Sequence, residues 1–486
     1  MKIRLLALTA LLVGAANVAT AAPRLDAKAI TTEGMKRFGF TLLQKAYAGR
    51  QKDPIAISPF SISEALVLAT SGSEKETNQQ MCSVFLTPAI LQQGASSGLL
   101  VEGVSSLRRD LTDYAKRSKD AFVFTSANSL VGNSNSKVQF KYEPAFKQLA
   151  AEKFGASVVD YDFMDPATLG KVNAWVDTET QGKIKELIKQ LKPEDAAILL
   201  NAVYSRGKFA KHFHSLSEGT FTNSAGDKST VTYMSQRSSM PYIEDGDVRM
   251  VSLSIGDSPG KPGAVPSDVA LDILAPAAGS DLDALVAALD GKTYSDLVVK
   301  LKPETLALRI PASKLEQKEA LSLRPILENA PYNVTRPFNE DEAQFRPMGS
   351  VVSEANLYVR DVLTKTFYEV TPLGFEAAAA TAVLMATRTS AGPQPVAFDV
   401  EGPSIHVIRH IPTGTPLFLS IVDSGVKYDE ARLVEMIEIG AKATRHISAK
   451  VADGNLQIIY TDRTFKEKAI AVVDDDGNTV RVIKKI

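Results

Sequence analysis

The segment over residues 374–390, GFEAAAATAVLMATRTS, constrains the fold most, because its composition fits two different structures. Its Ala, Glu, Leu and Met residues favour a helix, whereas the small side chains of its four-alanine run also fit a crowded central strand. The segment lies between a strand-like run, residues 367–370, and the Gly and Pro residues at 392, 393 and 395. A surface helix with an alanine face and a buried strand are both open on this pattern, so the surrounding chain has to decide.

The size and charge of the chain limit its classes of partner. Its 486 residues are enough for one large domain or for two or three smaller ones, and 44% hydrophobic with 23% charged residues is ordinary for a soluble protein. The 55 basic and 56 acidic side chains give a formal net charge of -1. No bulk electrostatic field therefore attracts nucleic acid or anionic lipid, and we expect no nucleic-acid partner.

The first residues have the pattern of an export signal. Two basic residues precede an apolar run over residues 5–13, and residues 19–21 are small side chains at cleavage spacing. We expect a signal peptide over residues 1–21 and a mature chain that begins near Ala22; an uncleaved membrane anchor is the alternative. The expected location is secreted, periplasmic or extracellular, with no membrane association after cleavage.

Hydrophobic patterns place helices at the beginning of the chain and strands towards its end. Because Cys82 is the only cysteine, no disulfide can form within the chain, and its stability must come from packing. Ser58 before Pro59 is typical of a helix start. We expect helices over residues 31–47, 59–68, 142–154 and 172–184, a turn over 72–77, and strands over 122–131, 158–161, 198–204, 221–254, 269–274 and 306–311. This order lacks regular βαβ alternation and predicts an α+β fold.

Seven blocks of the sequence, in the same order and at compatible spacing, resemble the serpin family. They are ISPFSI at 57–62; residues 72–77 with Gln80-Met81; SANSL at 126–130; VNAWV at 172–176 with 180–184; LNAVY at 200–204 with GKF at 207–209; residues 364–369 with the 374–390 segment; and IRH at 408–410 with 412–418. The similarity extends over residues 31–422.

This resemblance implies a serpin fold with three β-sheets, about nine helices and an exposed reactive-centre loop at about residues 372–396, within a domain over residues 22–424. In that family the loop is cut by a protease, and its N-terminal part inserts as a new central strand before the acyl-enzyme is hydrolysed. Such a suicide substrate needs a kinetically trapped, strained native state. The implied function is a serine protease inhibitor and not an enzyme. The alternative is a serpin-fold protein that does not inhibit: a cleavable substrate, a chaperone or a binding module.

The register of the resemblance assigns roles within the loop. Fourteen residues beyond Gly374 it places the reactive bond at Arg388-Thr389; cleavage one residue to either side, with Arg388 a solvated loop charge, is the alternative. An Arg before the bond suits the buried carboxylate of a trypsin-like protease, so we expect such a partner; a cysteine protease is also possible. Alternate residues of the inserting strand would face the core. The residues assigned to the hinge are Gly374, Phe375, Glu376, Ala377, Ala378, Ala379, Ala380 and Thr381.

The chain also departs from the family pattern. Phe375 stands where the family usually has a small residue. A buried aromatic ring there could make insertion slower than deacylation of the acyl-enzyme, and the protein would then behave as a substrate. Pro372 replaces a Glu at the base of the loop and cannot donate a ladder hydrogen bond. Ser404 stands where the family has Phe. The implied sheet-opening region comprises Ser58, Ser61, Asn201, Thr364 and Phe209, of which Thr364 matches a histidine and Phe209 a tryptophan of the family.

The residues give less support to enzymatic or metal chemistry. No Gly-x-Ser-x-Gly elbow is present, which leaves a hydrolase as the third interpretation. His212 and His214 could form a metal pair, but no third ligand stands at a recognisable spacing, so we expect core or sheet-edge histidines and no metal or cofactor.

A basic cluster occurs near the place where some serpins bind polyanions such as heparin. Three aspartates, at 110, 113 and 120, interrupt it. We therefore expect a solvated helix face and no polyanion binding. The basic residues are Arg108, Arg109, Lys116, Arg117 and Lys119.

Residues 425–486 lie beyond the serpin pattern and are expected to form a C-terminal extension. The pattern predicts an amphipathic helix over residues 429–444, strands over 447–451 and 456–460, and a hairpin over 469–483 that turns at Asp476-Gly477. The extension is either a partner-binding appendix or a segment that packs against the serpin body.

Overall fold

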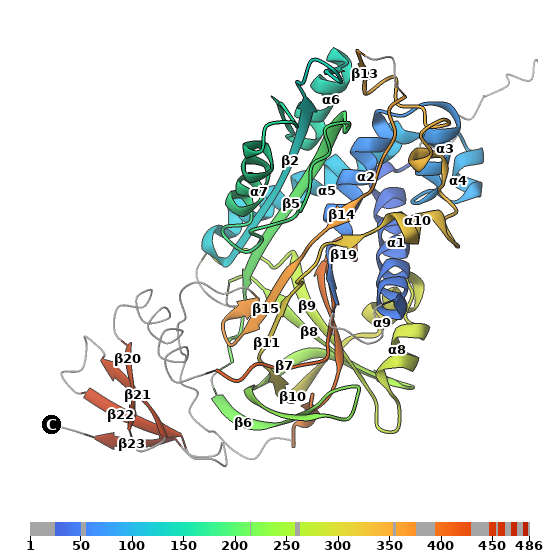
Figure 1. Cartoon of the computed structure of the whole chain (residues 1–486). Helices are drawn as coiled ribbons and strands as arrows, with labels where there is room; N and C mark the ends of the chain where they lie inside the picture. Colours follow the sequence, from blue (N-terminus) through green and yellow to red (C-terminus); the bar gives the residue numbers. More distant parts are fainter. Residues whose placement is uncertain are drawn as a thin grey trace, which may run out of the picture.

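The computed structural model describes residues 25–49, 55–213, 215–257, 263–352, 356–375 and 394–428, together with four strands between residues 447 and 484. In this part of the chain there are ten α-helices and two short 3-10 helices, and the strands form five sheets. Figure 1 shows α2, α3, α4 and α6 towards one end of an elongated body and β6, β7 and β10 towards the other.

The N-terminal part is helical because apolar residues recur at helical spacing. Met35, Phe38 and Leu42 are buried on α1, and the Ser58 side chain caps α2 by accepting a hydrogen bond from the Ser61 amide. Eleven of the thirteen α2 residues are buried, so this helix lies inside the molecule. The α-helices are α1 (Ala27–Gly49), α2 (Pro59–Ser71), α3 (Lys75–Ser83), α4 (Pro88–Gln92), α5 (Ser97–Ser118), α6 (Pro144–Phe154), α7 (Ala167–Glu179), α8 (Leu282–Ala288), α9 (Gly291–Lys300) and α10 (Arg324–Glu328). The 3-10 helices are η1 (Lys119–Ala121) and η2 (Arg336–Phe338).

The sheet that carries the functional site has six strands, in the order β11-β15-β16-β5-β2-β4. They are β11 (Ser313–Glu316), β15 (Phe367–Thr371), β16 (Gly374–Phe375), β5 (Ala197–Lys208), β2 (Phe122–Asn133) and β4 (Ser157–Tyr161). Only β2 and β4 are parallel, and β2 pairs with β5 along eleven residues, from Phe122–Gly207 to Gly132–Ala197. We call this the main sheet.

A second large sheet has nine strands, in the order β1-β19-β18-β9-β8-β7-β10-β17, with β6 also paired to β7. The long β7 joins its two halves, because it pairs with β8 at one end and with β10 and β6 along the rest. The strands are β1 (Ile55–Ile57), β6 (Ser215–Thr222), β7 (Lys228–Asp245), β8 (Val248–Ile255), β9 (Val269–Pro276), β10 (Lys302–Pro311), β17 (Val396–Asp399), β18 (Ser404–His410) and β19 (Thr415–Val422). Every residue of β18 and β19 is buried.

The remaining sheets are small. Two strand pairs, β12 (Leu321–Ser322) with β14 (Leu363–Thr364) and β13 (Gly349–Val351) with β3 (Phe140–Tyr142), flank the main sheet. The C-terminal strands lie close to the predicted strands and hairpin and form one antiparallel four-stranded sheet in chain order: β20 (Ile447–Ala452), β21 (Asn455–Thr461), β22 (Lys468–Val473) and β23 (Val480–Lys484). The helix expected over residues 429–444 and the turn at Asp476-Gly477 lie outside the described residues.

Three predicted boundaries were wrong. The turn over residues 72–77 is shorter, because α3 already begins at Lys75. Tyr142 belongs to β3, and the helix after it begins at Pro144, where proline is favourable in a first turn. The helix expected to reach residue 184 ends at Glu179, because Gln181 and Gly182 have φ values of 52° and 82°, which no α-helix accommodates.

The chain that follows β19 is held in the seam between the two large sheets. The Val426 amide donates to the Ala312 carbonyl at 2.8 Å, and the Val426 carbonyl accepts from the Thr232 amide at 2.9 Å. Tyr428 is 8% exposed; its amide donates to Thr232 Oγ1 at 2.9 Å and its hydroxyl donates to the Val370 carbonyl at 3.5 Å. The segment Gly425 to Tyr428 is therefore attached mainly to Thr232 of β7 and to Ala312, and the Tyr428 hydroxyl adds one longer contact with β15 of the main sheet.

A buried histidine connects the two large sheets beneath β15. The Tyr368 hydroxyl and His406 Nδ1 are 2.7 Å apart, and His406 Nε2 is 3.2 Å from the Ser404 hydroxyl. Burial of the ring lowers the pKa of His406 from 6.5 to about 3. Both ring nitrogens have partners, so the neutral imidazole fits this position without an unpaired polar atom.

None of the helices in the described residues is long and apolar enough to span a membrane.

We predict that acid weakens the fold partly through His406. Its folded-state pKa of about 3 lies below its ordinary value of 6.5, so its stabilising contribution is present above pH 6.5 and is lost as the pH falls towards 3. The variant His406→Asn cannot titrate and should show a shallower loss of thermal midpoint over this range. The measurement is thermal unfolding from pH 7 to pH 4 for both proteins. Equal slopes would show that His406 does not contribute.

Candidate functional site

The first two residues of the predicted hinge, Gly374 and Phe375, already lie inside the main sheet. β15 turns back through Pro372 and Leu373 into β16, which pairs Val370 with Phe375 and Thr371 with Gly374. On its other side β16 pairs Gly374 with Lys208 and Phe375 with Gly207 of β5. Figure 1 shows β5 and β15 as neighbouring strands. Gly374 and Phe375 therefore fill one end of the space between them.

Two glycines make this close pairing possible. A Cβ on Gly374 would lie 1.9 Å from the Gly207 carbonyl oxygen, far inside contact distance. A Cβ on Gly207 would lie 2.5 Å from the Phe375 ring and 2.3 Å from the Ile255 side chain. Gly374 therefore lets the backbones of β5 and β16 approach each other, and Gly207 leaves room for the Phe375 ring and the Ile255 side chain.

Phe375 is buried in this position. Its side chain belongs to the main hydrophobic core, the residue is 2% exposed, and its ring covers Gly207 on the neighbouring strand. An aromatic residue opposite a glycine is a stabilising pair in a sheet, since the ring fills the space above the missing side chain. The sequence pattern suggested that the large Phe375 side chain would obstruct insertion. In the structure the ring is already accommodated beside Gly207.

Pro372 lies in the turn, where its missing N–H removes no ladder bond. The Pro372 carbonyl accepts from the Phe213 amide at 3.0 Å, and the Leu373 carbonyl accepts from the Phe209 amide at 2.9 Å. Phe209 itself is 1% exposed and contacts Phe213 edge-on, with ring centroids 5.4 Å apart. The base of the loop is held by these backbone bonds.

Most of the predicted loop lies outside the described residues. This applies to Glu376, Ala377, Ala378, Ala379, Ala380 and Thr381 of the hinge and to the expected reactive bond, Arg388-Thr389. The position of the bond stays a prediction.

Three residues of the predicted sheet-opening region meet beneath the main sheet. Ser61 on α2 donates a hydrogen bond to Asn201 Oδ1 on β5, and Asn201 Nδ2 donates to Asn128 Oδ1 on β2 at 2.8 Å. Ser58 stands one turn earlier, where its hydroxyl donates to the Leu417 carbonyl of β19 at 2.8 Å. These contacts tie α2 to β2 and β5. Phe209 and Thr364 are not in this cluster.

Sequence reasoning missed a buried ion pair next to this cluster. Glu64 on α2 is fully buried, accepts a hydrogen bond from the Ser126 hydroxyl of β2, and pairs with Arg108 Nη1 of α5 at 3.2 Å. Arg108 Nη2 also donates to the Ser126 carbonyl at 2.8 Å. Burial of the carboxyl raises the pKa of Glu64, while Arg108, Ser126 and Asn201 act in the opposite direction. A charged residue inside an otherwise apolar helix stretch, two residues after the ISPFSI block, was the available signal.

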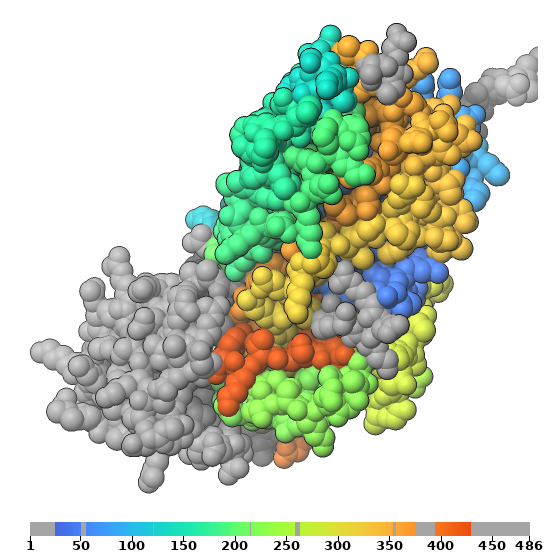
Figure 2. All heavy atoms as spheres, viewed as in Figure 1, coloured from blue at the N-terminus to red at the C-terminus, as the bar shows by residue number. Residues whose placement is uncertain are grey.

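A cavity of about 490 Å³ lies where the main sheet is open. One wall is the first part of β5, residues 197–201, and the opposite wall is the segment over residues 356–364. In the described residues no strand pairs with this edge of β5 from 197 to 201. α2 forms the floor, and Ser61, Asn201 and Thr364 all line the cavity. In Figure 2 the two walls meet on the visible face, green on one side and orange on the other. We call this space the sheet cavity.

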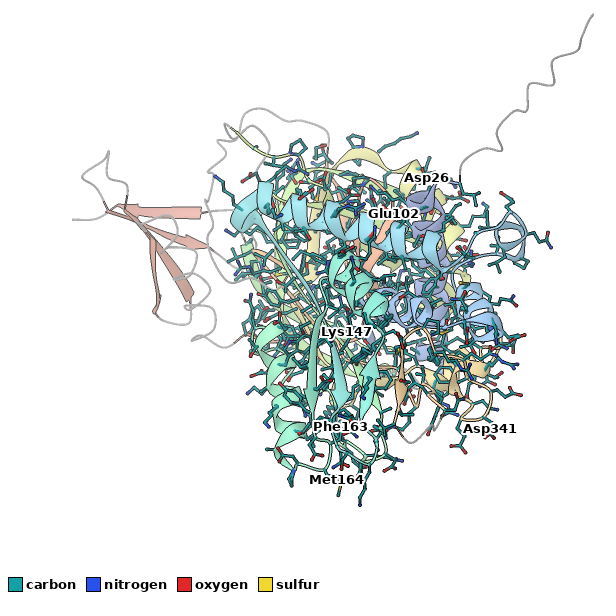
Figure 3. All side chains as sticks on the ribbon, turned by 90° about the horizontal axis from the view of Figure 1, so that it is seen from above. Asp26, Glu102, Lys147, Phe163, Met164 and Asp341 are labelled. Atoms are coloured by element: carbon teal, nitrogen blue, oxygen red, sulfur yellow. The ribbon has the colours of Figure 1, made fainter. Side chains whose placement is uncertain are left out.

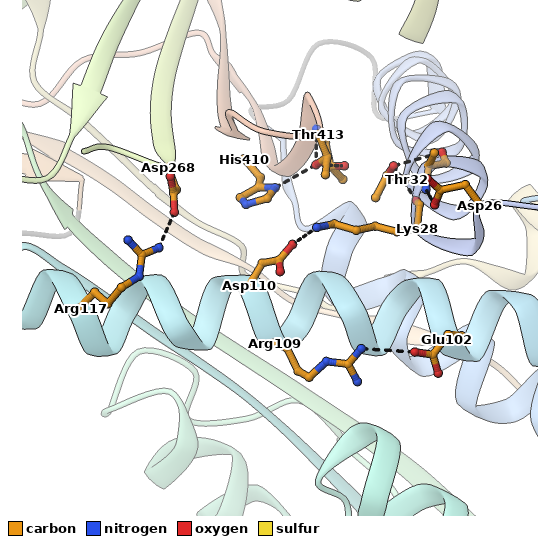
Figure 4. Close-up of polar contacts among 12 residues, drawn as sticks. Asp26, Lys28, Thr32, Glu102, Arg109, Asp110, Arg117, Asp268, His410 and Thr413 are labelled. Carbon is orange, nitrogen blue, oxygen red and sulfur yellow. Dashed lines mark hydrogen bonds and ion pairs between the residues drawn. The ribbon is translucent and has the colours of Figure 1, made fainter. Parts of the chain in front are cut away.

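Four of the five residues of the basic cluster lie on α5 and pair with acidic residues. Arg109 pairs with Glu102 at 3.3 Å, Lys116 with Asp113 at 3.8 Å and Arg117 with Asp268 at 2.8 Å. Asp110, in turn, pairs with Lys28 of α1, as Figure 4 shows. The expectation of a solvated helix face was wrong for Arg108. Its side chain points inward to Glu64 and is only 22% exposed.

Glu102 pairs with two cations, one on its own helix and one on α6. Besides Arg109 it accepts a hydrogen bond from Lys153 of α6 at 2.9 Å. Figure 3 shows α5, with Glu102 labelled, lying next to α6, which carries the labelled Lys147. Because acidic residues are interleaved with the cations, this face offers a polyanion no continuous positive field.

The histidines form no metal site in the described residues. His406 and His410 are buried, each about 1% exposed, and burial lowers the pKa of His212 and of His410 to about 4. His214 and His446 lie outside the described residues. Among the residues that the structure describes, no three His, Cys, Asp or Glu side chains are grouped so that they could hold a metal ion.

Known proteins resemble this chain over most of its length. A model of the family Serpin (serine protease inhibitor) matches residues 33–424. Iripin-8 of Ixodes ricinus is 28% identical over 398 residues, 79% of this chain and 91% of the relative. Plasminogen activator inhibitor 2 of Homo sapiens is 26% identical over 423 residues, 78% of this chain and 96% of the relative. The native structure of tengpin, a thermophilic serpin, superposes with a TM-score of 0.67 at 25% identity, covering 82% of this chain and 95% of that one.

We predict that the variant Gly374→Ala releases β16 from the main sheet. The added Cβ would overlap the Gly207 carbonyl oxygen, and overpacking of this kind costs about 1–3 kcal/mol. Hydrogen–deuterium exchange should become faster in peptides that contain residues 205–210 and 370–376. In the matched control, Gly170→Ala, the new methyl group on α7 meets nothing within 4 Å, so exchange should not increase. Unchanged exchange in Gly374→Ala would show that the pairing does not depend on this contact.

Proposed function

The chain belongs to the serpin family, and we propose that it inhibits a serine protease by the cleavage and insertion of the loop that begins at Gly374. The observation that carries this proposal is the placement of β16. Gly374 and Phe375 pair with β15 and with Gly207 and Lys208 of β5, and the sheet cavity lies farther along the same edge of β5, at residues 197–201.

Insertion would complete the hydrogen bonding of the main sheet. The edge of β5 from residue 197 to residue 201 carries backbone groups that an additional strand could pair with. The alanine run at residues 377–380 offers small side chains, which enter a gap between strands more easily than large ones. Filling the cavity and pairing this edge would stabilise the cleaved form. This gain in free energy would drive the conformational change that traps the protease.

The proposed target follows from the residue before the expected bond. Arg388 presents a guanidinium that a buried carboxylate in a protease pocket can bind with two hydrogen bonds. We propose a trypsin-like serine protease as the partner.

We also propose export of the protein, with residues 1–21 as a signal peptide, a serpin domain over 22–424 and an extension over 425–486; these divisions rest on the sequence pattern alone.

The inhibitory function is tested by incubation with trypsin and electrophoresis under denaturing conditions. We expect a conjugate that survives the denaturant, together with chain cleaved after Arg388. The variant Arg388→Gln should lose the conjugate, whereas Lys302→Gln, which removes an exposed charge on β10, should keep it. Cleavage after Arg388 without any conjugate would contradict inhibition and favour the cleavable, non-inhibitory alternative.

Loop insertion has a separate readout in the cleaved protein. If the loop enters the main sheet, chain cut in the loop should unfold at a higher temperature than intact chain, because it has gained strand pairing and packing. An equal or lower thermal midpoint would contradict insertion, even if the protein were cut efficiently.

The structure leads to a specific expectation for Phe375. Its ring is already buried above Gly207, so it does not have to enter the sheet after cleavage. The variant Phe375→Thr removes that packing and should free the start of the loop, giving less conjugate per cleavage event with trypsin. Phe375→Leu, which stays large and apolar, is the matched control and should remain near the wild type. More conjugate from Phe375→Thr would instead mean that the aromatic ring slows insertion.

A further inference from the structure

We propose that the sheet cavity is a binding site for an uncharged, mainly apolar small molecule, and that such a ligand competes with loop insertion. The binding claim stands on the cavity itself. The competition claim rests on the proposed function.

The volume and lining of the cavity suit a compact organic ligand. Its volume of about 490 Å³ is within the range of small-molecule sites, which are mostly apolar with a few polar groups. Side chains from separate parts of the chain converge on it: Leu66 and Ala69 of α2, Met81 of α3, and Phe338 and Phe345 from the region around η2. Each of these five residues is at most 8% exposed. A ligand that covers this surface gains roughly 25 cal/mol for each Å² of apolar area removed from water.

The polar groups at one end of the cavity are uncharged. Ser61, Asn201 and Thr364 can donate or accept hydrogen bonds, which suits a hydroxyl or carbonyl group of a ligand. The carboxyl of Glu64 lies just behind them, hydrogen-bonded to Ser126 and paired with Arg108. A buried carboxylate beside the site disfavours an anionic ligand at this end.

The charges at the opposite rim cancel. The lining carries three cations, Lys189, Lys192 and Arg360, and three acidic residues, Glu194, Asp195 and Asp361. Arg360 pairs with Asp195 at 2.8 Å. Neither end therefore offers a net charge that would select an ionised ligand, and burying an unpaired charge among the apolar side chains would be costly. This balance is why we commit to an uncharged ligand.

A bound ligand would occupy the place that the inserting strand needs. The wall formed by residues 197–201 is the same edge of β5 that an additional strand would pair with. A protein with the ligand bound should therefore be cut by the protease at an unchanged site but trap it less often. The ligand would shift the outcome from inhibitor to substrate without touching Arg388.

The test uses the full chain and N-phenyl-1-naphthylamine, an uncharged apolar dye whose fluorescence rises in apolar surroundings. We expect saturable binding to intact protein. Two variants narrow the cavity, Ala65→Phe from its floor on α2 and Leu357→Trp from one wall. Each should weaken binding about tenfold or more, which is about 1.4 kcal/mol. Ala287→Phe, at an exposed position on α8, is the matched control and should bind like the wild type. Circular dichroism confirms that the variants are folded.

Three results would overturn parts of the proposal. Unchanged dye binding in both folded cavity variants would place the dye elsewhere and reject the site. Displacement by dodecanoate that is stronger than displacement by 1-dodecanol would reject the uncharged ligand class. If loop-cleaved protein binds the dye as well as intact protein does, the competition is rejected and so is the proposed insertion, whereas the binding site stands. Loss of binding on cleavage, with less conjugate in the presence of 1-dodecanol, would support both.

Discussion

Two glycines, Gly207 and Gly374, allow β16 to lie between β15 and β5, and the arrangement of the whole site depends on that contact. A side chain at either position would collide with the neighbouring strand or with the Phe375 ring. Because β16 is only two residues long, it closes one end of the gap and leaves the sheet cavity beyond it. The main sheet is thus complete at one end and open along the rest, within one continuous fold.

The polar contacts beneath the main sheet connect its strands to different parts of the fold. Ser61, Asn201 and Asn128 join α2 to β5 and β2, and the Glu64–Arg108 pair adds α5 to the same group. A buried ion pair contributes little net stability, but breaking it is costly, since one charge would be left without a partner in the interior. These contacts bind β2 and β5 to their helices, whereas β15 is held separately through Tyr368 and His406 to the other large sheet. The gap lies between these two groups.

Sequence reasoning reached the parts of this arrangement that local patterns encode. The Ser58 cap, the buried stripe of α1, the long β2 and the C-terminal strands follow from spacing, from turn residues and from helix-start signals. It did not predict that Arg108 points inward or that Glu64 is buried, because both depend on contacts between residues more than forty positions apart. Phe375 shows the same limit. Its size suggested an obstacle to insertion, but the space for its ring is provided by Gly207, which is distant in the sequence.

The attachment of residues 425–428 also has a mechanical meaning. Val426 is bonded to Ala312 and Thr232, and the Tyr428 hydroxyl reaches the backbone of Val370, the residue that pairs with Phe375. A pull on the chain beyond Tyr428 would load these bonds first and would pass directly to β15. A partner or a fused domain attached beyond Tyr428 would therefore transmit force to β15, the strand that holds the start of the loop.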